Sequence, residues 1–307
     1  MEENAVVVKN SVQGESLGLR IYLLGGFRVM VGQRVVAEKE WRLRKARSLF
    51  KLLALAPHHR SHREQLCEHL WPELDPEAAF NNLHRVVHTI RHVLEPALEP
   101  LQPSAYLRFQ EDALLLSPSI SAWIDVEQFE AARRASREIQ EPAAYRAALA
   151  LYAGDLLPED RYEDWAASRR AQLRQSYLGL LTDLARLYAK RNEDDAVIET
   201  LQKLVTEEPT LEEAQLKLMR LYAETGQRYQ ALHQFQQLRD ALRRELDTEP
   251  ALTVQRLYQD IQTGRFAPER KRLPTRPLVS TTAMSSPREE QAYPPPSAQN
   301  SLPHALT

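Results

Sequence analysis

The sequence predicts a mainly α-helical protein with a small β part, in which an N-terminal winged helix-turn-helix is followed by an all-α, tetratricopeptide-like repeat domain. Three observations predict this fold class. Two β-rich stretches enclose three amphipathic helical segments, helical patterns follow one another from Trp123 onward, and a seven-residue pattern returns after 34 residues.

The chain begins with a segment that lacks periodicity, residues 1–18, which we expect to be a flexible leader. Residues 19–36, LRIYLLGGFRVMVGQRVV, then contain short β-rich runs. These runs are interrupted at Gly25-Gly26 and at Gly32-Gln33, which are residue pairs typical of hairpin turns. The pattern predicts a small antiparallel sheet.

Three helical segments follow, over residues 41–56, 63–70 and 76–94, and Pro57, Pro72 and Pro76 mark the breaks between them. The sequence YLRFQEDALLLSP, beginning at Tyr106, then contains two β-like runs around Gln110-Glu111-Asp112, which predicts a second hairpin. The order of sheet, three helices and hairpin is that of a winged helix-turn-helix. We expect this DNA-binding domain to span residues 19–121.

The second half of the chain shows helical periodicity in seven segments: 126–138, 142–153, 162–190, 194–207, 211–224, 229–246 and 251–263. The sequence DLARLYA at 183–189 returns as KLMRLYA at 217–223, an offset of 34 residues, which is the tetratricopeptide period. Such helix pairs stack and offer a surface for binding or dimerisation. We expect this domain over residues 122–265 and a disordered, Pro-rich tail or linker over residues 266–307.

Composition limits the classes of protein to be considered. The chain has 40 Lys plus Arg against 42 Asp plus Glu, but the stretch from Arg20 to Arg63 has eleven basic and two acidic residues and would attract a polyanion. A single cysteine, Cys67, excludes a disulfide framework and predicts a core thiol. Because there is no secretory leader or apolar run of about 18–20 residues, we expect a cytoplasmic, nucleoid-associated protein without membrane contact.

The predicted helix 76–94 has two contrasting faces. At 100° per residue, its apolar residues share a face that must point into the domain, and the opposite face carries Asn, Arg and His. In the major groove, Asn can pair with adenine and Arg with guanine. The base-reading candidates are Asn81, Asn82, Arg85, His88, Thr89 and His92. The alternative is an ordinary solvated surface of polar residues.

Basic residues on the neighbouring elements are candidates for contacts with phosphates, which give affinity and register without sequence information. They are Arg42, Arg44, Lys45, Arg47, His62, Arg63, Arg91 and Arg108. The alternative is that these charges are those that helix surfaces ordinarily carry. Topology and charge together favour DNA binding.

The sequence argues against a metal site and against catalysis. His84, His88 and His92 follow one another at i, i+4 and i+8, but a structural zinc site needs four converging ligands, and Cys67 lies on another predicted helix. The phosphate-loop, dinucleotide-binding, HExxH and GxSxG motifs are absent from the sequence. We therefore expect no metal, no cofactor and no enzymatic activity.

Several motifs make the chain resemble a known family. EHLWP at 68–72, WIDVEQFEAA at 123–132, AGDLLP at 153–158 and YEDW at 162–165 resemble, in order, segments of SARP-type (antibiotic regulatory protein-like) bacterial transcriptional activators. The resemblance extends over residues 19 to about 263. It implies a response-regulator-type winged helix packed against a bacterial transcriptional activator domain.

For function, the resemblance implies binding of direct repeats in promoter DNA by two protomers side by side, and activation through contact with RNA polymerase. One departure is that the helix 76–94 is richer in His and Asn than the Arg-heavy family versions, so the family's base preference is not carried over.

Two alternatives remain open at this stage. The first is a protein-interaction module, in which the helical repeats bind a partner. In the second, the closing sequence NSLPHALT, which resembles the segment leading into the ATPase module of larger relatives, marks the chain as the N-terminal part of a longer regulator.

Overall fold

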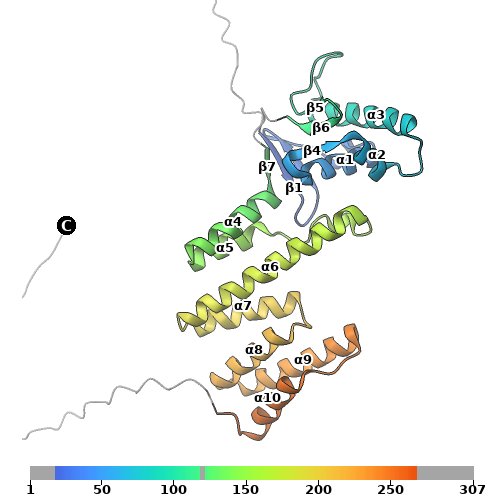
Figure 1. Ribbon diagram of the computed structural model, residues 1–307. Coiled ribbons are helices and arrows are strands. Elements are labelled where there is room, and N and C mark those ends of the chain that lie inside the picture. The colour runs from blue at the N-terminus through green and yellow to red at the C-terminus, as the bar shows by residue number, and fades with distance from the viewer. Residues whose placement is uncertain (1–17, 118–121, 268–307) are drawn as a thin grey trace, which may run out of the picture. The chain divides into compact units, whose positions relative to one another are not determined.

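The predicted fold class is confirmed by the computed structural model of the chain, which describes residues 18–117 and 122–267 (Figure 1). A small β-containing part with three helices forms the N-terminal region, and a stack of helices follows it. Most of the predicted leader and tail, residues 1–17 and 268–307, lies outside the described residues.

The first sheet has the strand order β3-β2-β1-β7. Strands β1 (Leu19–Tyr22), β2 (Arg28–Val31) and β3 (Arg34–Val35) pair antiparallel, as predicted, and β7 (Ala122–Ile124) pairs parallel with β1. The prediction that strand patterns end before Trp123 was wrong, because Trp123 lies in β7. Parallel pairing with a strand about one hundred residues earlier leaves no signal in so short a local pattern.

The three predicted helices are present as α1 (Arg44–Leu55), α2 (Arg63–Leu70) and α3 (Pro76–Leu94). The second hairpin is β5 (Leu107–Gln110) and β6 (Ala113–Leu116), and it belongs to a sheet of order β4-β6-β5. The third strand, β4 (Arg60–His62), lies between α1 and α2, where the sequence predicted no strand. Three polar residues carry no strand pattern of their own, and their pairing with β6 determines the strand.

The apolar faces of α1 and α3 meet in one core. Leu49, Phe50 and Leu53 of α1 and Leu83 and Ile90 of α3 are at most 1% exposed. Burying one such side chain contributes about 1.5–3 kcal/mol, so these contacts hold α3 in a fixed orientation on α1. Cys67 of α2 is buried in the same core, as predicted.

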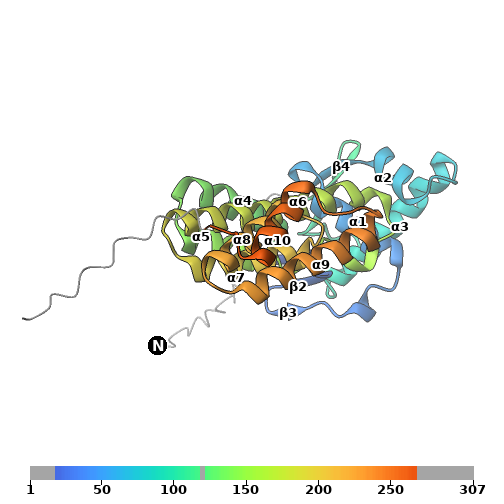
Figure 2. The same ribbon diagram turned by 90° about the horizontal axis from the view of Figure 1, so that it is seen from below.

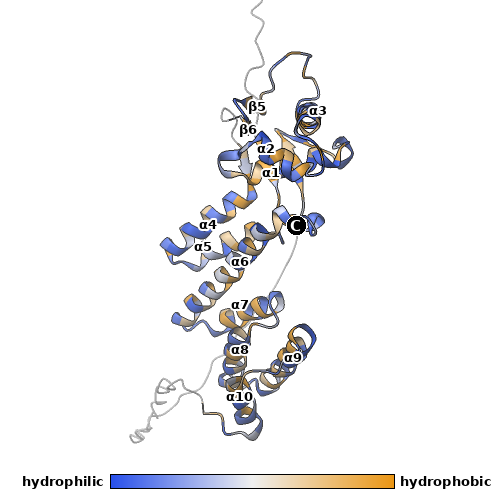
Figure 3. Cartoon of the chain, turned by 45° about the vertical axis from the view of Figure 1, so that its right-hand side comes forward, coloured by the Kyte–Doolittle hydropathy of each residue, from blue (hydrophilic) through white to orange (hydrophobic). Residues whose placement is uncertain are grey.

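The remaining helices are α4 (Asp125–Ile139), α5 (Pro142–Leu151), α6 (Asp164–Lys190), α7 (Asp194–Glu207), α8 (Glu212–Glu224), α9 (Arg228–Leu246) and α10 (Leu252–Thr263). The 34-residue repeat corresponds to the successive helix pairs α6–α7 and α8–α9. Its equivalent tyrosines, Tyr188 and Tyr222, are both buried between helices. Figure 2 looks onto the α9–α10 end of the stack. Figure 3 shows hydrophobic and hydrophilic residues alternating along these helices, as packing on one side requires.

The stack joins the first sheet through a short segment between α5 and α6 that includes the 3-10 helix η3 (Pro158–Asp160). Leu24 and Leu156 form a β-bridge there, and the backbone N–H of Leu157 donates to the carbonyl of Leu23. Within the described residues, no helix is long and apolar enough to cross a membrane.

Candidate nucleic-acid interface

Helix α3 is fixed at both ends by polar contacts. The Asp75 carboxylate caps the first turn by accepting from the backbone N–H of Ala78 at 3.0 Å, and Pro76 occupies the first turn, where no backbone N–H is needed. At the other end, the Arg34 guanidinium donates to the carbonyls of Val93 (2.6 Å) and Leu94 (3.1 Å). A cation that satisfies the last carbonyls also suits the helix dipole, so α3 is well ordered to its end.

The structure places the polar face of α3 in solvent. Asn81, Arg85, His88 and His92 are exposed, and Asn82 and Thr89 are partly exposed beside them. The opposite face, with Leu83, Val87, Ile90 and Leu94, is buried. The six base-reading candidates therefore share one side of the helix.

These side chains differ in whether they already have partners. The Nε2 atoms of His88 and His92 lie 3.1 Å apart, and the Thr89 hydroxyl donates to the carbonyl of Arg85 at 3.0 Å. Within residues 18–117 and 122–267, no hydrogen bond or ion pair uses the side chains of Asn81, Asn82 or Arg85. Their donors and acceptors are available to an external ligand.

One group of phosphate candidates surrounds α3. Arg91 donates to the carbonyl of Leu107 on β5 at 3.2 Å, and Arg108 on β5 donates to the Ser117 hydroxyl at 2.8 Å. At the start of α2, Arg63 pairs with Asp112 of the β5–β6 turn at 2.8 Å, and His62 lies beside it. Arg63, Arg91 and Arg108 thus place positive charge on α3 itself and on the neighbouring elements α2 and β5.

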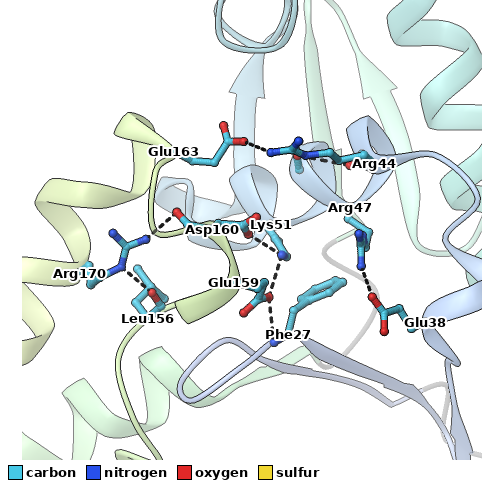
Figure 4. A network of polar contacts seen from close by, with 11 residues as sticks. Phe27, Glu38, Arg44, Arg47, Lys51, Leu156, Glu159, Asp160, Glu163 and Arg170 are labelled. Atoms are coloured by element: carbon cyan, nitrogen blue, oxygen red, sulfur yellow. Dashed lines mark hydrogen bonds and ion pairs between the residues drawn. The ribbon is translucent and has the colours of Figure 1, made fainter.

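The other group lies on or just before α1. Arg44 pairs with Glu163 at 2.8 Å, and Arg47 pairs with Glu38 at 2.7 Å (Figure 4). Arg42 and Lys45 are exposed, and no described residue forms a hydrogen bond or ion pair with their side chains. The structure thus separates the predicted phosphate residues into a set around α3 and a set near the junction with the helical stack.

Sequence reasoning missed two residues that matter for this arrangement. One is Arg34, which holds the end of α3, and the other is Lys51 of α1, which is buried at the junction. A signal for Lys51 was present, because Arg44, Arg47 and Lys51 follow one another at i, i+3 and i+7 and form a cationic stripe along one helix face.

Among the described residues, no group of three or more His, Cys, Asp or Glu side chains is arranged to hold a metal ion.

Comparison with known proteins gives matches to parts of this architecture. The family model of the bacterial transcriptional activator domain matches residues 124–262. Among solved structures, a chain of Mycobacterium tuberculosis EmbR, in complex with a low-affinity phosphopeptide, is similar with 22% sequence identity and a TM-score of 0.62. No curated protein matches the sequence.

The similarity to EmbR covers 80% of this chain and 65% of the EmbR chain. It shows that the two share a fold. The chain described here therefore spans about 65% of the length of that EmbR chain.

Proposed function

Because residues 124–262 match the bacterial transcriptional activator domain and a winged helix precedes them, we propose that the chain is a SARP-type transcriptional regulator. In this role it binds direct repeats in promoter DNA and activates transcription by contacting RNA polymerase. In this proposal α3 lies in the major groove. The protein acts in the cytoplasm, associated with the nucleoid, as two protomers side by side on DNA. It carries out no catalytic step itself and needs no cofactor.

The observation that carries the proposal is the exposed face of α3, where Arg85, Asn81 and Asn82 have no partner within the described residues. Unpaired guanidinium and amide groups on a rigid helix are suited to paired hydrogen bonds with guanine and adenine edges. His88, Thr89 and His92 lie on the same side and complete the proposed base-reading set.

Phosphate contacts in this proposal come from both basic groups. His62, Arg63, Arg91 and Arg108 would hold the strands on either side of the groove. Arg42 and Lys45 are unpaired within the described chain. Arg44, Arg47 and Arg63 are paired and would have to exchange their carboxylate partners for phosphates. Such contacts supply affinity that falls as salt rises.

The test is a comparison of Arg85→Ala with the parent on a duplex chosen by binding-site selection with the full chain. Loss of one paired base contact should weaken specific binding by about 1–3 kcal/mol, or roughly 5- to 150-fold, with the preference at one base position relaxed. Arg134→Ala is the matched control, because Arg134 is exposed on α4, away from α3.

Equal affinity of Arg85→Ala and the parent would refute the placement of α3. A folded parent that shows no salt-dependent affinity for any duplex would instead support a protein-interaction module.

A further inference from the structure

A buried lysine connects the N-terminal part to the helical stack. The Lys51 side chain on α1 is 3% exposed, and its ammonium lies 2.9 Å from a Glu159 carboxylate oxygen and 2.5 Å from one of Asp160 (Figure 4). It also lies 4.6 Å from the centroid of the Phe27 ring. We call Lys51, Glu159, Asp160 and Phe27 the junction cluster. A buried ammonium is stable only while such partners are in place.

The carboxylates of this cluster are themselves held in position. Glu159 also accepts from the backbone N–H of Phe27 at 3.1 Å. Burial raises the pKa of Glu159, but the hydrogen bonds from Lys51 and from backbone N–H groups outweigh this effect and bring its pKa below the usual value. Glu159 is therefore ionised at neutral pH and keeps its attraction to the ammonium.

Backbone contacts surround the cluster. The N–H of Gly25 donates to the carbonyl of Asp155 at 3.0 Å, next to the bridge between Leu24 and Leu156. The approach is close enough that a Cβ atom at Gly25 would lie 2.8 Å from the carbonyl oxygen of Ala153. The segment between α5 and α6 thus pairs directly with the backbone just after β1.

The same segment is also attached to the helical stack. Arg170 on α6 donates to the carbonyl of Leu156 at 2.8 Å and to that of Asp160 at 3.0 Å. A force on α6 would therefore act through this segment on α1, and α1 packs on α3 through the shared core.

We propose that Lys51 is a positioning residue that holds the winged helix and the helical stack in one orientation, so that contacts made by the stack determine where α3 can bind. This inference rests on the proposed function. On a tandem operator, protomers that touch through their helical stacks would then accept only one spacing of half-sites. Changing the spacing by one base pair rotates the second site by about 34° and moves it about 3.4 Å.

If Lys51 only stabilised the fold, the result would be different. Removing its side chain would then lower the free energy of unfolding without changing the distance between the domains or the preferred spacing of half-sites.

The first experiment measures the orientation without DNA. Spin labels at Glu68→Cys on α2 and Gln259→Cys on α10 report the distance between the domains in the full chain, since the single native cysteine, Cys67, is buried. We expect one narrow distance distribution for the parent and a broad one for Lys51→Met. The double variant Glu159→Gln/Asp160→Asn removes the carboxylates instead and should broaden the distribution too. It serves as the independent test if Lys51→Met does not fold.

The matched control is Glu213→Gln, which removes one exposed ion pair with Lys217 inside α8 and should leave the distribution unchanged. A narrow, parent-like distribution in folded variants of the junction cluster would overturn the inference.

The second experiment varies the spacing of two selected half-sites, one base pair at a time. For the parent we expect the affinity for the tandem site to fall about tenfold or more for each base pair by which the spacing is changed. For the junction variants we expect a fall of about threefold or less. All of these proteins should bind a single half-site with equal affinity. A parent that binds no duplex defeats the proposed function and leaves the distance measurement to decide on Lys51. A parent that prefers one spacing, with junction variants that keep the same preference, defeats the inference alone.

Discussion

Replacing Asp125 by Ala should destabilise the chain strongly, because this buried carboxylate connects the first sheet to α4. Its side chain accepts hydrogen bonds from the backbone N–H groups of Leu23 at 2.8 Å and Leu24 at 2.9 Å, and from that of Val126 at 2.8 Å. Asp125 is 4% exposed, and Leu23 and Leu24 are at most 2% exposed. In the variant, the N–H groups of Leu23 and Leu24 would have no acceptor and no water.

The magnitude follows from these two donors. An unsatisfied buried donor costs about 1–3 kcal/mol, and relief from the burial of a carboxylate offsets part of the sum, so we expect a loss of about 2–4 kcal/mol. Urea denaturation of the full chain measures it as a lower midpoint. Asp240→Ala, on the exposed side of α9, is the control and should change the free energy of unfolding by less than about 0.5 kcal/mol.

The pH dependence of the stability gives a second, independent test of the role of Asp125. Burial raises the pKa of Asp125 above its ordinary value of 3.8, and the backbone hydrogen bonds reduce this effect only in part. As pH rises past 3.8, the carboxyl ionises first in the unfolded chain, so its contribution to stability falls until the pH exceeds the folded-state pKa. The cost of Asp125→Ala is therefore largest in acid.

Two results would refute this reasoning. One is a variant within about 0.5 kcal/mol of the parent at every pH, and the other is a cost that increases from acid to neutral pH.

Three other substitutions have effects that the structure predicts. Gly25→Ala should lower the free energy of unfolding by about 2–4 kcal/mol, because φ is +75° and the new Cβ would lie 2.8 Å from a backbone oxygen; an unchanged thermal midpoint would contradict this. Gly179→Ala in the interior of α6 should raise the free energy of unfolding by about 0.5–1 kcal/mol, since the nearest atom to the new Cβ is 3.8 Å away; a lower midpoint in denaturant titration would contradict this. Phe50→Ala should cost about 3–5 kcal/mol by leaving a cavity among Phe27, Trp41 and the helices, and a loss below about 1 kcal/mol would exclude that packing.

Much of the fold was predictable because periodicity is a local property. The predicted segment 194–207 has the same bounds as α7, and the predicted start at Pro142 is the observed start of α5. The apolar face of α3 could also be predicted from helical geometry alone, and Leu83 and Ile90 are buried as that geometry requires.

What the sequence did not predict depends on contacts between distant residues. Strand β7 forms only through pairing with β1, and β4 only through pairing with β6. The roles of Arg34 and Lys51 depend on partners 59 and 108 residues away, Val93 and Glu159. For the same reason Arg44, which counts as a phosphate candidate by charge, has a carboxylate partner, Glu163, that no local pattern shows.

Binding-site selection from a random duplex library with the full chain tests the central claim most directly. We predict enrichment of a tandem repeat that the protein binds less tightly as salt rises. A plot of the logarithm of the binding constant against the logarithm of the salt concentration should have a slope of about −0.9 for each phosphate contacted. Recovery of no enriched sequence, from protein shown to be folded, would contradict the claim that α3 reads promoter DNA.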